Sequence, residues 1–139
     1  NHFGIVMDSA SGEASLGCHA WNVTDGNWNP GSGIALTPLI EGIDSLQVLY
    51  GIDDSGGTSR SPTRYVDADS VSDWSDVLAI RIAVLANSVN RVTPTPVDRN
   101  YVLLDSDPLA SADLLGPDGN PDSRARQIYS TTIHLKNTD

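Results

Sequence analysis

Residues 77–86 restrict the fold of this chain more than any other segment. Large aliphatic residues at the even positions alternate with alanines and one arginine at the odd positions: Leu78, Ile80, Ile82 and Val84 against Ala79, Arg81 and Ala83. Because consecutive side chains of a strand point to opposite faces, the pattern predicts a strand with one apolar face and one partly wet face. Its length and β-branched composition are typical of a central strand. A helix is the alternative, since Ala and Leu occur in both states.

Other segments predict further strands. Leu46, Val48, Tyr50 and Ile52 fall on one face of a strand, opposite Gln47 and Gly51. Residues 126–136 alternate in the same way. We expect Tyr129, Ile133 and Leu135 to form a buried face. The solvated face would consist of Ser130, Thr132, His134 and Lys136. The apolar stretches 2–8 and 14–21 flank a turn-like segment and predict a β-hairpin. Residues 101–104 predict a short edge strand.

Two short helical turns are expected between these strands. Thr37 can cap a helix that begins at Pro38, and Gly42 ends that helix early. Ser70-Val71-Ser72-Asp73 is similar to a capping box that opens a single turn through Trp74. The breaker-rich segments 22–33, 53–64, 87–100 and 105–123 predict long loops. The sequence therefore predicts one globular domain over residues 1–139, of class α+β, with an antiparallel sheet, short helical turns and long loops.

Charge and hydropathy exclude several partners. The 139-residue chain has 8 basic and 18 acidic residues, a formal net charge of −10, so nucleic acid and anionic membranes are poor partners. The sequence contains no apolar run of membrane-spanning length. Cys18 is the single cysteine. In a cytosolic protein such a cysteine is an ordinary buried thiol, whereas in an exported protein an odd cysteine suggests a redox partner outside the chain.

The loop Asp53-Asp54-Ser55-Gly56-Gly57 is the best metal candidate in the sequence. Calcium takes six to eight oxygen ligands, which Asp53 and Asp54 would begin to supply. Ser55 and Gly57 stand where further carboxylates are wanted, and the nearby Arg60 and Arg64 add repulsion. An ordinary glycine-rich loop is the alternative. We therefore expect no cofactor, with calcium at Asp53 and Asp54 as the candidate exception.

Catalytic patterns are missing from the sequence. No Gly-x-Ser-x-Gly nucleophile motif occurs. Cys18 and His19 are adjacent, and adjacent side chains in a strand point to opposite faces. We expect a protein that is not an enzyme. Trp28, in the Asn/Gly/Pro-rich loop, is the candidate interaction residue, the alternative being that its indole folds back over the core.

Four blocks of the sequence, taken in order, resemble a known family. Residues 38–53 contain Glu41-Gly42-Ile43 and Gln47-Val48-Leu49-Tyr50-Gly51-Ile52-Asp53, similar to the pattern E-G-[IV]-x-x-[LM]-Q-V-x-Y-G-[VI]-D. Residues 64–82 resemble R-Y-V-x-A-x-x-V-x-D-W-x-x-V-x-x-[VI]-R-[IV]. Residues 126–137 resemble R-x-[VI]-[FY]-x-x-T-[VI]-x-L-[RK]-N, and residues 14–18 resemble an upstream block. The family is that of the PilW-like minor pilins of type IV pilus assembly systems.

This resemblance implies a fold, a role and partners. It implies a pilin-like globular head whose family carries a methylated, hydrophobic N-terminal helix, which anchors the subunit. The sequence lacks such a helix, so we expect the chain to be the C-terminal globular portion. The implied role is to join other minor pilins in a complex that primes pilus assembly and lies near the tip.

The implied partners are other minor pilins, the major pilin and a tip adhesin. The implied location is the inner membrane, facing the periplasm, before assembly and the extracellular pilus afterwards. Membrane contact would come only through the missing helix. The alternative function is a freestanding extracellular binding module, such as a calcium-dependent adhesin domain.

Overall fold

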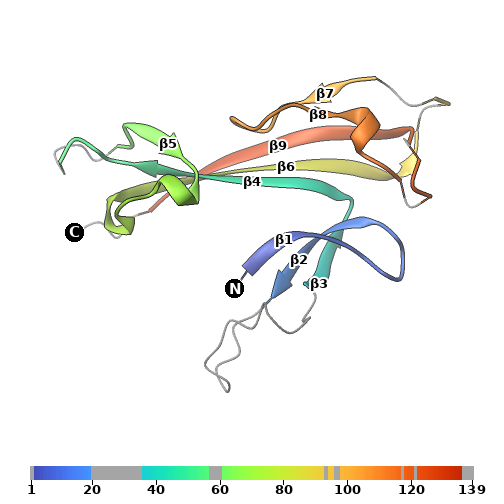
Figure 1. Ribbon diagram of the computed structural model, residues 1–139, viewed down its shortest axis with the longest axis horizontal. Coiled ribbons are helices and arrows are strands. Elements are labelled where there is room, and N and C mark those ends of the chain that lie inside the picture. The colour runs from blue at the N-terminus through green and yellow to red at the C-terminus, as the bar shows by residue number, and fades with distance from the viewer. Residues whose placement is uncertain are drawn as a thin grey trace, which may run out of the picture.

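The computed structural model describes residues 2–19, 36–56, 61–92, 94–95, 98–116, 118–120 and 122–135. Strands and short 3₁₀ turns follow one another through this part of the chain (Figure 1). The strands are β1 (His2–Met7), β2 (Ala14–His19), β3 (Thr37–Glu41), β4 (Ile43–Ile52), β5 (Arg64–Val66), β6 (Val77–Arg91), β7 (Asn100–Tyr101), β8 (Leu109–Ala110) and β9 (Arg124–His134). The turns are η1 (Ala68–Ser70), η2 (Trp74–Asp76) and η3 (Ser111–Asp113).

The described strands form three antiparallel sheets, and the predicted α+β class is wrong. Their strand orders are β1-β2-β3, β5-β4-β6-β9 and β7-β8. Over the same residues, the helical segments are 3₁₀ turns of three residues each. An α-helix becomes stable only after several residues have joined it, and Gly42 follows Pro38 too closely to allow such a helix. The described part of the chain is therefore mainly β-sheet.

β6 is the central strand of the four-stranded sheet, as residues 77–86 predicted. It pairs with β4 along one side, from Ala86 opposite Ile43 to Val77 opposite Ile52. On its other side it pairs with β9, in a register that sets Ala79 against His134. Figure 1 shows β4, β6 and β9 running side by side as the longest ribbons. The predicted alternation of β4 is confirmed for Leu46, Val48 and Tyr50, which pair with even residues of β6, whereas Ile52 pairs with Val77 after a register shift.

The odd-numbered face of β6 is the more deeply buried one, although the sequence predicted it to be partly wet. Ala83 and Leu85 are fully buried beneath Tyr101 and Leu103 of the segment 98–116. The alanine methyl leaves room for this segment to lie close to the sheet. Arg81 shares this face, where its guanidinium carbon stacks 3.9 Å from the centre of the Tyr65 ring and its Nε donates to the Thr132 hydroxyl (3.3 Å).

The three-stranded sheet contains the predicted hairpin and replaces one predicted helix. β1 and β2 pair from His2 opposite His19 to Met7 opposite Ala14, which confirms the hairpin. The helix predicted from Pro38 is wrong, because residues 37–41 form β3 and pair with β2. β3 is an outer strand, where a proline that lacks an N–H is tolerated.

Gly42 joins this sheet to the four-stranded one. Its φ of 78° lies in the left-handed region, which glycine adopts without steric strain. The N–H of Gly42 donates to the carbonyl of Ala14 (3.0 Å), and its own carbonyl accepts from the N–H of Asn87 (2.8 Å). The residue expected to end a helix therefore directs the chain from β3 into β4.

The turns before β6 are capped by aspartates. The predicted capping box with Ser70 as its first residue is wrong, since Ser70 ends η1. Asp67 accepts a hydrogen bond from the Ser70 N–H (2.8 Å). Asp73 caps η2 by accepting from the Ser75 N–H (2.9 Å), so the turn at Trp74 exists as a 3₁₀ turn. An aspartate side chain reaches an amide two or three residues ahead, which favours such short turns.

The C-terminal strand is more exposed than its alternation predicted. Tyr129 and Ile133, expected to be buried, are 61% and 48% exposed. β9 is an edge strand, and the segment 98–116 covers the opposite face of the sheet. Residues 101–104 were predicted as an edge strand. Of these, only Tyr101 is in a strand, the two-residue β7, which pairs with β8.

Candidate interaction surface

Asp53 and Asp54, the sequence-predicted metal ligands, form different local contacts. The Asp53 side chain is buried, and its Oδ1 accepts from the N–H of Ser55 (2.9 Å) and from the Ser55 hydroxyl (2.5 Å). Asp54 is exposed and accepts from the Thr63 hydroxyl (2.5 Å) and from Nε of Arg64 (2.9 Å). The Thr63 hydrogen bond, followed by the Arg64 guanidinium, holds the pKa of Asp54 below its usual value. Protein donors thus already engage both carboxylates.

These contacts fit a hydrogen-bonded turn better than a calcium site. Calcium prefers several converging oxygens, and in the described part of the chain no three acidic, histidine or cysteine side chains gather into a metal-binding group. The Arg64 guanidinium occupies one side of the Asp54 carboxylate. The calcium hypothesis for Asp53 and Asp54 stays a prediction, and Trp28, the predicted contact residue, lies outside the described residues.

One face of the four-stranded sheet is apolar and partly exposed to solvent. The sequence had predicted that these side chains would form the buried face of the sheet. Three rows of residues lie across β4, β6 and β9, as the pairing register shows: Leu46, Val84 and Tyr129; Val48, Ile82 and Thr131; Tyr50, Ile80 and Ile133. None of these nine residues is charged. We call this set the open face.

Exposure grows toward the β9 side of the open face. The β6 residues are half-buried among their neighbours, whereas Tyr129 and Ile133 are more than one third exposed. At the other end, Trp74 packs edge-on against Tyr50, with ring centres 4.9 Å apart, and is itself 57% exposed. The face thus combines half-buried aliphatic residues with three exposed large side chains, Trp74, Tyr129 and Ile133.

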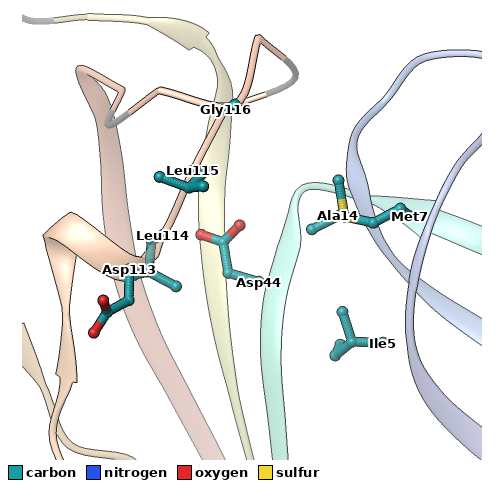
Figure 2. Close-up of a pocket in the computed structure, with 9 residues that line it drawn as sticks. Ile5, Met7, Ala14, Asp44, Asp113, Leu114, Leu115 and Gly116 are labelled. Atoms are coloured by element: carbon teal, nitrogen blue, oxygen red, sulfur yellow. The ribbon is translucent and has the colours of Figure 1, made fainter.

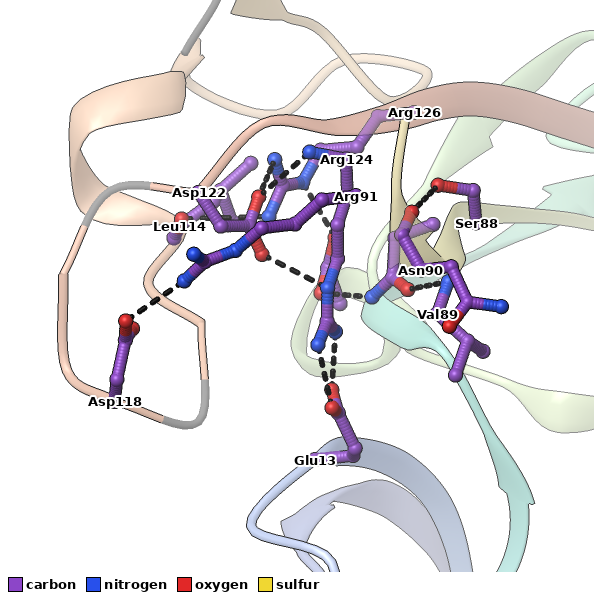
Figure 3. A network of polar contacts seen from close by, with 12 residues as sticks. Glu13, Ser88, Val89, Asn90, Arg91, Leu114, Asp118, Asp122, Arg124 and Arg126 are labelled. Carbon is purple, nitrogen blue, oxygen red and sulfur yellow. Dashed lines mark hydrogen bonds and ion pairs between the residues drawn. The ribbon is translucent and has the colours of Figure 1, made fainter. Parts of the chain in front are cut away.

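A buried ion-pair network fixes the sheets relative to each other at the start of β9 (Figure 3). Both guanidinium nitrogens at the tip of Arg124 donate to the Glu13 carboxylate, which precedes β2. Arg126 donates from Nε to Asp44 (2.7 Å) and from Nη1 to Asp122 (2.9 Å). The side chains of Arg126 and Asp122 are 2% and 1% exposed. Charged hydrogen bonds of this kind are strong and directional.

The network raises the pKa of both arginines. For Arg124, the hydrogen bonds to Glu13 are the main cause. For Arg126, burial alone would lower the pKa, but the contacts with Asp44 and Asp122 outweigh that effect. Nε of Arg124 lies 3.1 Å from Asp122 without a hydrogen bond between the two atoms, so we take this contact as an electrostatic one. These arginines therefore stay charged and serve structure, and the sequence had assigned them no role.

A hollow of about 410 Å³ lies between the three-stranded sheet and residues 113–116 and 119. Figure 2 shows Ile5, Met7 and Ala14 on one side of it and the 113–116 segment on the other, with the Asp44 carboxylate between them. That carboxylate is bound to Arg126 and Asn87. No residue of the lining supplies a nucleophile next to a base. The hollow therefore offers no catalytic arrangement.

Comparisons with known proteins give one match. The family model described as Type IV Pilus-assembly protein W (PilW) matches residues 5–137, nearly the whole chain. A comparison with curated proteins and one with solved structures found no significant match. In the described part of the chain, no helix is long and apolar enough to cross a membrane.

Proposed function

Because the chain belongs to the type IV pilus-assembly protein W family, it has a role in type IV pilus assembly, and we propose that this role is that of a non-enzymatic minor pilin in the complex that primes the pilus. The family is a pilus-assembly family and not a known enzyme family. Membership associates the chain with the cell envelope and with other pilus-assembly components. Family membership alone does not specify a minor-pilin role or a position near the tip, and both are parts of the proposal.

The open face is the observation that carries the proposal. A subunit that assembles by surface complementarity needs an apolar surface that stays accessible in the isolated domain. The open face provides one on a rigid support, because β6 is paired along both of its edges. The net charge of −10 keeps the domain soluble before it assembles and favours neighbours with basic patches.

The proposed assembly has a place in the cell and a set of neighbours. The domain faces the periplasm before assembly and the outside of the cell afterwards, held to the inner membrane or the filament by a hydrophobic helix. Its neighbours are other minor pilins and the major pilin, with a tip adhesin as a further partner. The open face packs against an apolar surface of one neighbour, and loops at its rim contribute polar contacts.

The test replaces the most exposed residues of the open face by polar ones. The double variant Tyr129→Ser, Ile133→Thr should keep the thermal midpoint of the wild type within a few degrees, because both side chains are largely exposed. It should reduce co-purification with the other minor pilins and lower the number of surface pili in a complemented deletion strain. Val102→Thr, a change of similar exposure outside the open face, is the matched control. Normal piliation and binding by the folded double variant would refute the proposed interface.

A further inference from the structure

The outer edge of β9 is a free strand edge. β9 ends the four-stranded sheet, and no other strand of the described residues pairs with that edge. Leu135, just after β9, donates its N–H to the carbonyl of Leu78 next to it on β6 (2.8 Å). Because successive backbone groups of a strand point to opposite sides, Ser130, Thr132 and His134 direct their N–H and C=O groups away from β6.

This edge lacks the devices that usually prevent strand pairing. Natural edges are shortened, or carry proline, bulges or charged side chains. β5 has three residues, and β3 contains Pro38. β9 has eleven residues, and its segment 127–133 contains neither proline nor a charged residue. The pairing with β6 runs without a register shift from Ala79 to Asn87.

We propose that β9 pairs antiparallel with β9 of a second copy of this chain, about a twofold axis at Thr131. Residues opposite each other in such a pair lie on the same face, and this axis sets Tyr129 of each copy against Ile133 of the other. Ser130 then exchanges both backbone hydrogen bonds with Thr132 of the second copy, in the phase that the outward groups require. The two four-stranded sheets become one sheet of eight strands, and the open face continues across the axis.

The uncharged centre of the edge suits a second copy as the occupant, and the net charge predicts how salt acts. Two copies of net charge −10 repel each other at long range. About this axis, residues 129–133 of one copy oppose residues 133–129 of the other, and none of them is charged, so like charges do not meet in the central stretch of the contact. Screening by salt should therefore strengthen the association. A single strand pair buries little surface, so we expect a dissociation constant of about 10–1000 µM. This self-association does not depend on the pilus role.

The first test measures association of the whole chain by sedimentation equilibrium. We expect a monomer–dimer equilibrium that shifts toward dimer as sodium chloride is raised from about 0.05 to about 0.3 M. Thr132→Pro removes an outward N–H that the sheet does not use, so this variant should keep its circular dichroism and stay monomeric. The proposal is overturned if the wild type is monomeric at about 1 mM. It is also overturned if the Thr132→Pro variant dimerises like the wild type.

The second test locates the axis by cysteine cross-linking in a Cys18→Ser background. Thr131→Cys faces itself across the axis as a non-hydrogen-bonded pair, with Cα atoms about 4.5 Å apart, which a disulfide accepts. Ser130→Cys faces Thr132 of the second copy and is the matched control. We expect mild oxidation to cross-link Thr131→Cys at least about tenfold faster. Equal rates for the two variants overturn the proposed register.

Discussion

Arg126 is the residue on which the junction of the sheets depends most. Its guanidinium joins Asp44 at the start of β4 to Asp122 before β9, and its side chain is 2% exposed. Replacing all members of a buried ion pair by apolar residues often costs little stability, because burying the charges was itself costly. Removal of one member has a larger effect, since it leaves the other charges buried without their partner.

We predict that Arg126→Leu lowers the free energy of unfolding by about 3–5 kcal/mol. The variant leaves Asp44 and Asp122 close together without the cation between them. Urea denaturation followed by tryptophan fluorescence measures the change. Arg91→Leu removes an arginine whose pair with Asp118 is exposed, and should change the stability by less than about 1 kcal/mol. Equal effects of the two substitutions would contradict the role given to Arg126.

The ion-pair network could not have been predicted from the sequence. Arg126 and Asp44 are 82 positions apart, and Arg124 and Glu13 are 111 positions apart. Local alternation assigns a face to each side chain but does not say which distant carboxylate meets it. The Asp53–Asp54 loop was singled out as a metal candidate, whereas its hydrogen-bonded turn is a local feature, because the Asp53 carboxylate accepts from the amide two residues ahead.

The Asp73 cap predicts a pH dependence of stability. Hydrogen bonds from the hydroxyl and then the N–H of Ser75 lower the pKa of Asp73 below its ordinary value of 3.8. A carboxylate with a lowered pKa in the folded state stabilises the fold above the unfolded-state pKa, and this contribution is lost as pH falls through the folded-state pKa. Asp73→Asn keeps a cap that does not titrate, so its stability should fall less steeply than that of the wild type below pH 3.8.

Denaturant unfolding at several pH values on both sides of 3.8 would measure this difference. Asp69→Asn, which changes an exposed aspartate inside the neighbouring turn, is the control and should follow the wild type. Parallel stability curves for Asp73→Asn and the wild type would contradict the prediction.

At the scale of elements, period-2 patterns located the long strands but not always their buried faces, and the cap signal at Thr37-Pro38 did not produce a helix. β4 and β6 lie where alternation predicted them, because a paired central strand needs apolar side chains at a fixed period. Thr37-Pro38 has the local chemistry of a helix start, yet these residues form strand β3 because they pair with β2. The sequence also could not tell that the smaller residues of β6, with Ala83 among them, lie on the more deeply buried face. That outcome depends on where the segment 98–116 crosses the sheet.

Gly42 provides a prediction about the connection between β3 and β4. A Cβ at this position would lie 3.2 Å from the Asn87 carbonyl oxygen and 3.2 Å from Val89 Cγ2, on a backbone with φ of 78°. Gly42→Ala should therefore lower the free energy of unfolding by about 1–3 kcal/mol. Gly56→Ala is the matched control, since it has φ of 79° and open space around the added Cβ. Chemical denaturation of both variants separates the steric effect from the backbone effect, and identical losses would show that the contacts at Gly42 contribute nothing.

At the scale of the whole molecule, the three-stranded sheet is attached to the larger one by few connections. β4 contacts β1 and β2, Gly42 provides the covalent continuation, and Arg124 binds Glu13 across the gap between the sheets. Within the described residues, the two hydrophobic clusters lie on the four-stranded sheet and on segments packed against it. A unit with little apolar burial of its own opens more readily than the rest of the protein. The β1–β2 hairpin should therefore depend on its ion pair with β9.

Glu13→Gln tests this dependence, because it removes the charge of a largely buried carboxylate while keeping its shape. We expect amide hydrogen exchange in β1 and β2 to become about tenfold faster or more, since the loss of a buried charged pair lowers the free energy of local opening. Exchange in β6 should stay slow, because β6 is paired along both edges and opens only with the main sheet. Glu41→Gln, an exposed glutamate on β3, is the matched control and should leave exchange in the hairpin unchanged. Equal acceleration in β6 would mean that the two sheets unfold as one unit, and the ion pair would then contribute to the stability of the whole fold.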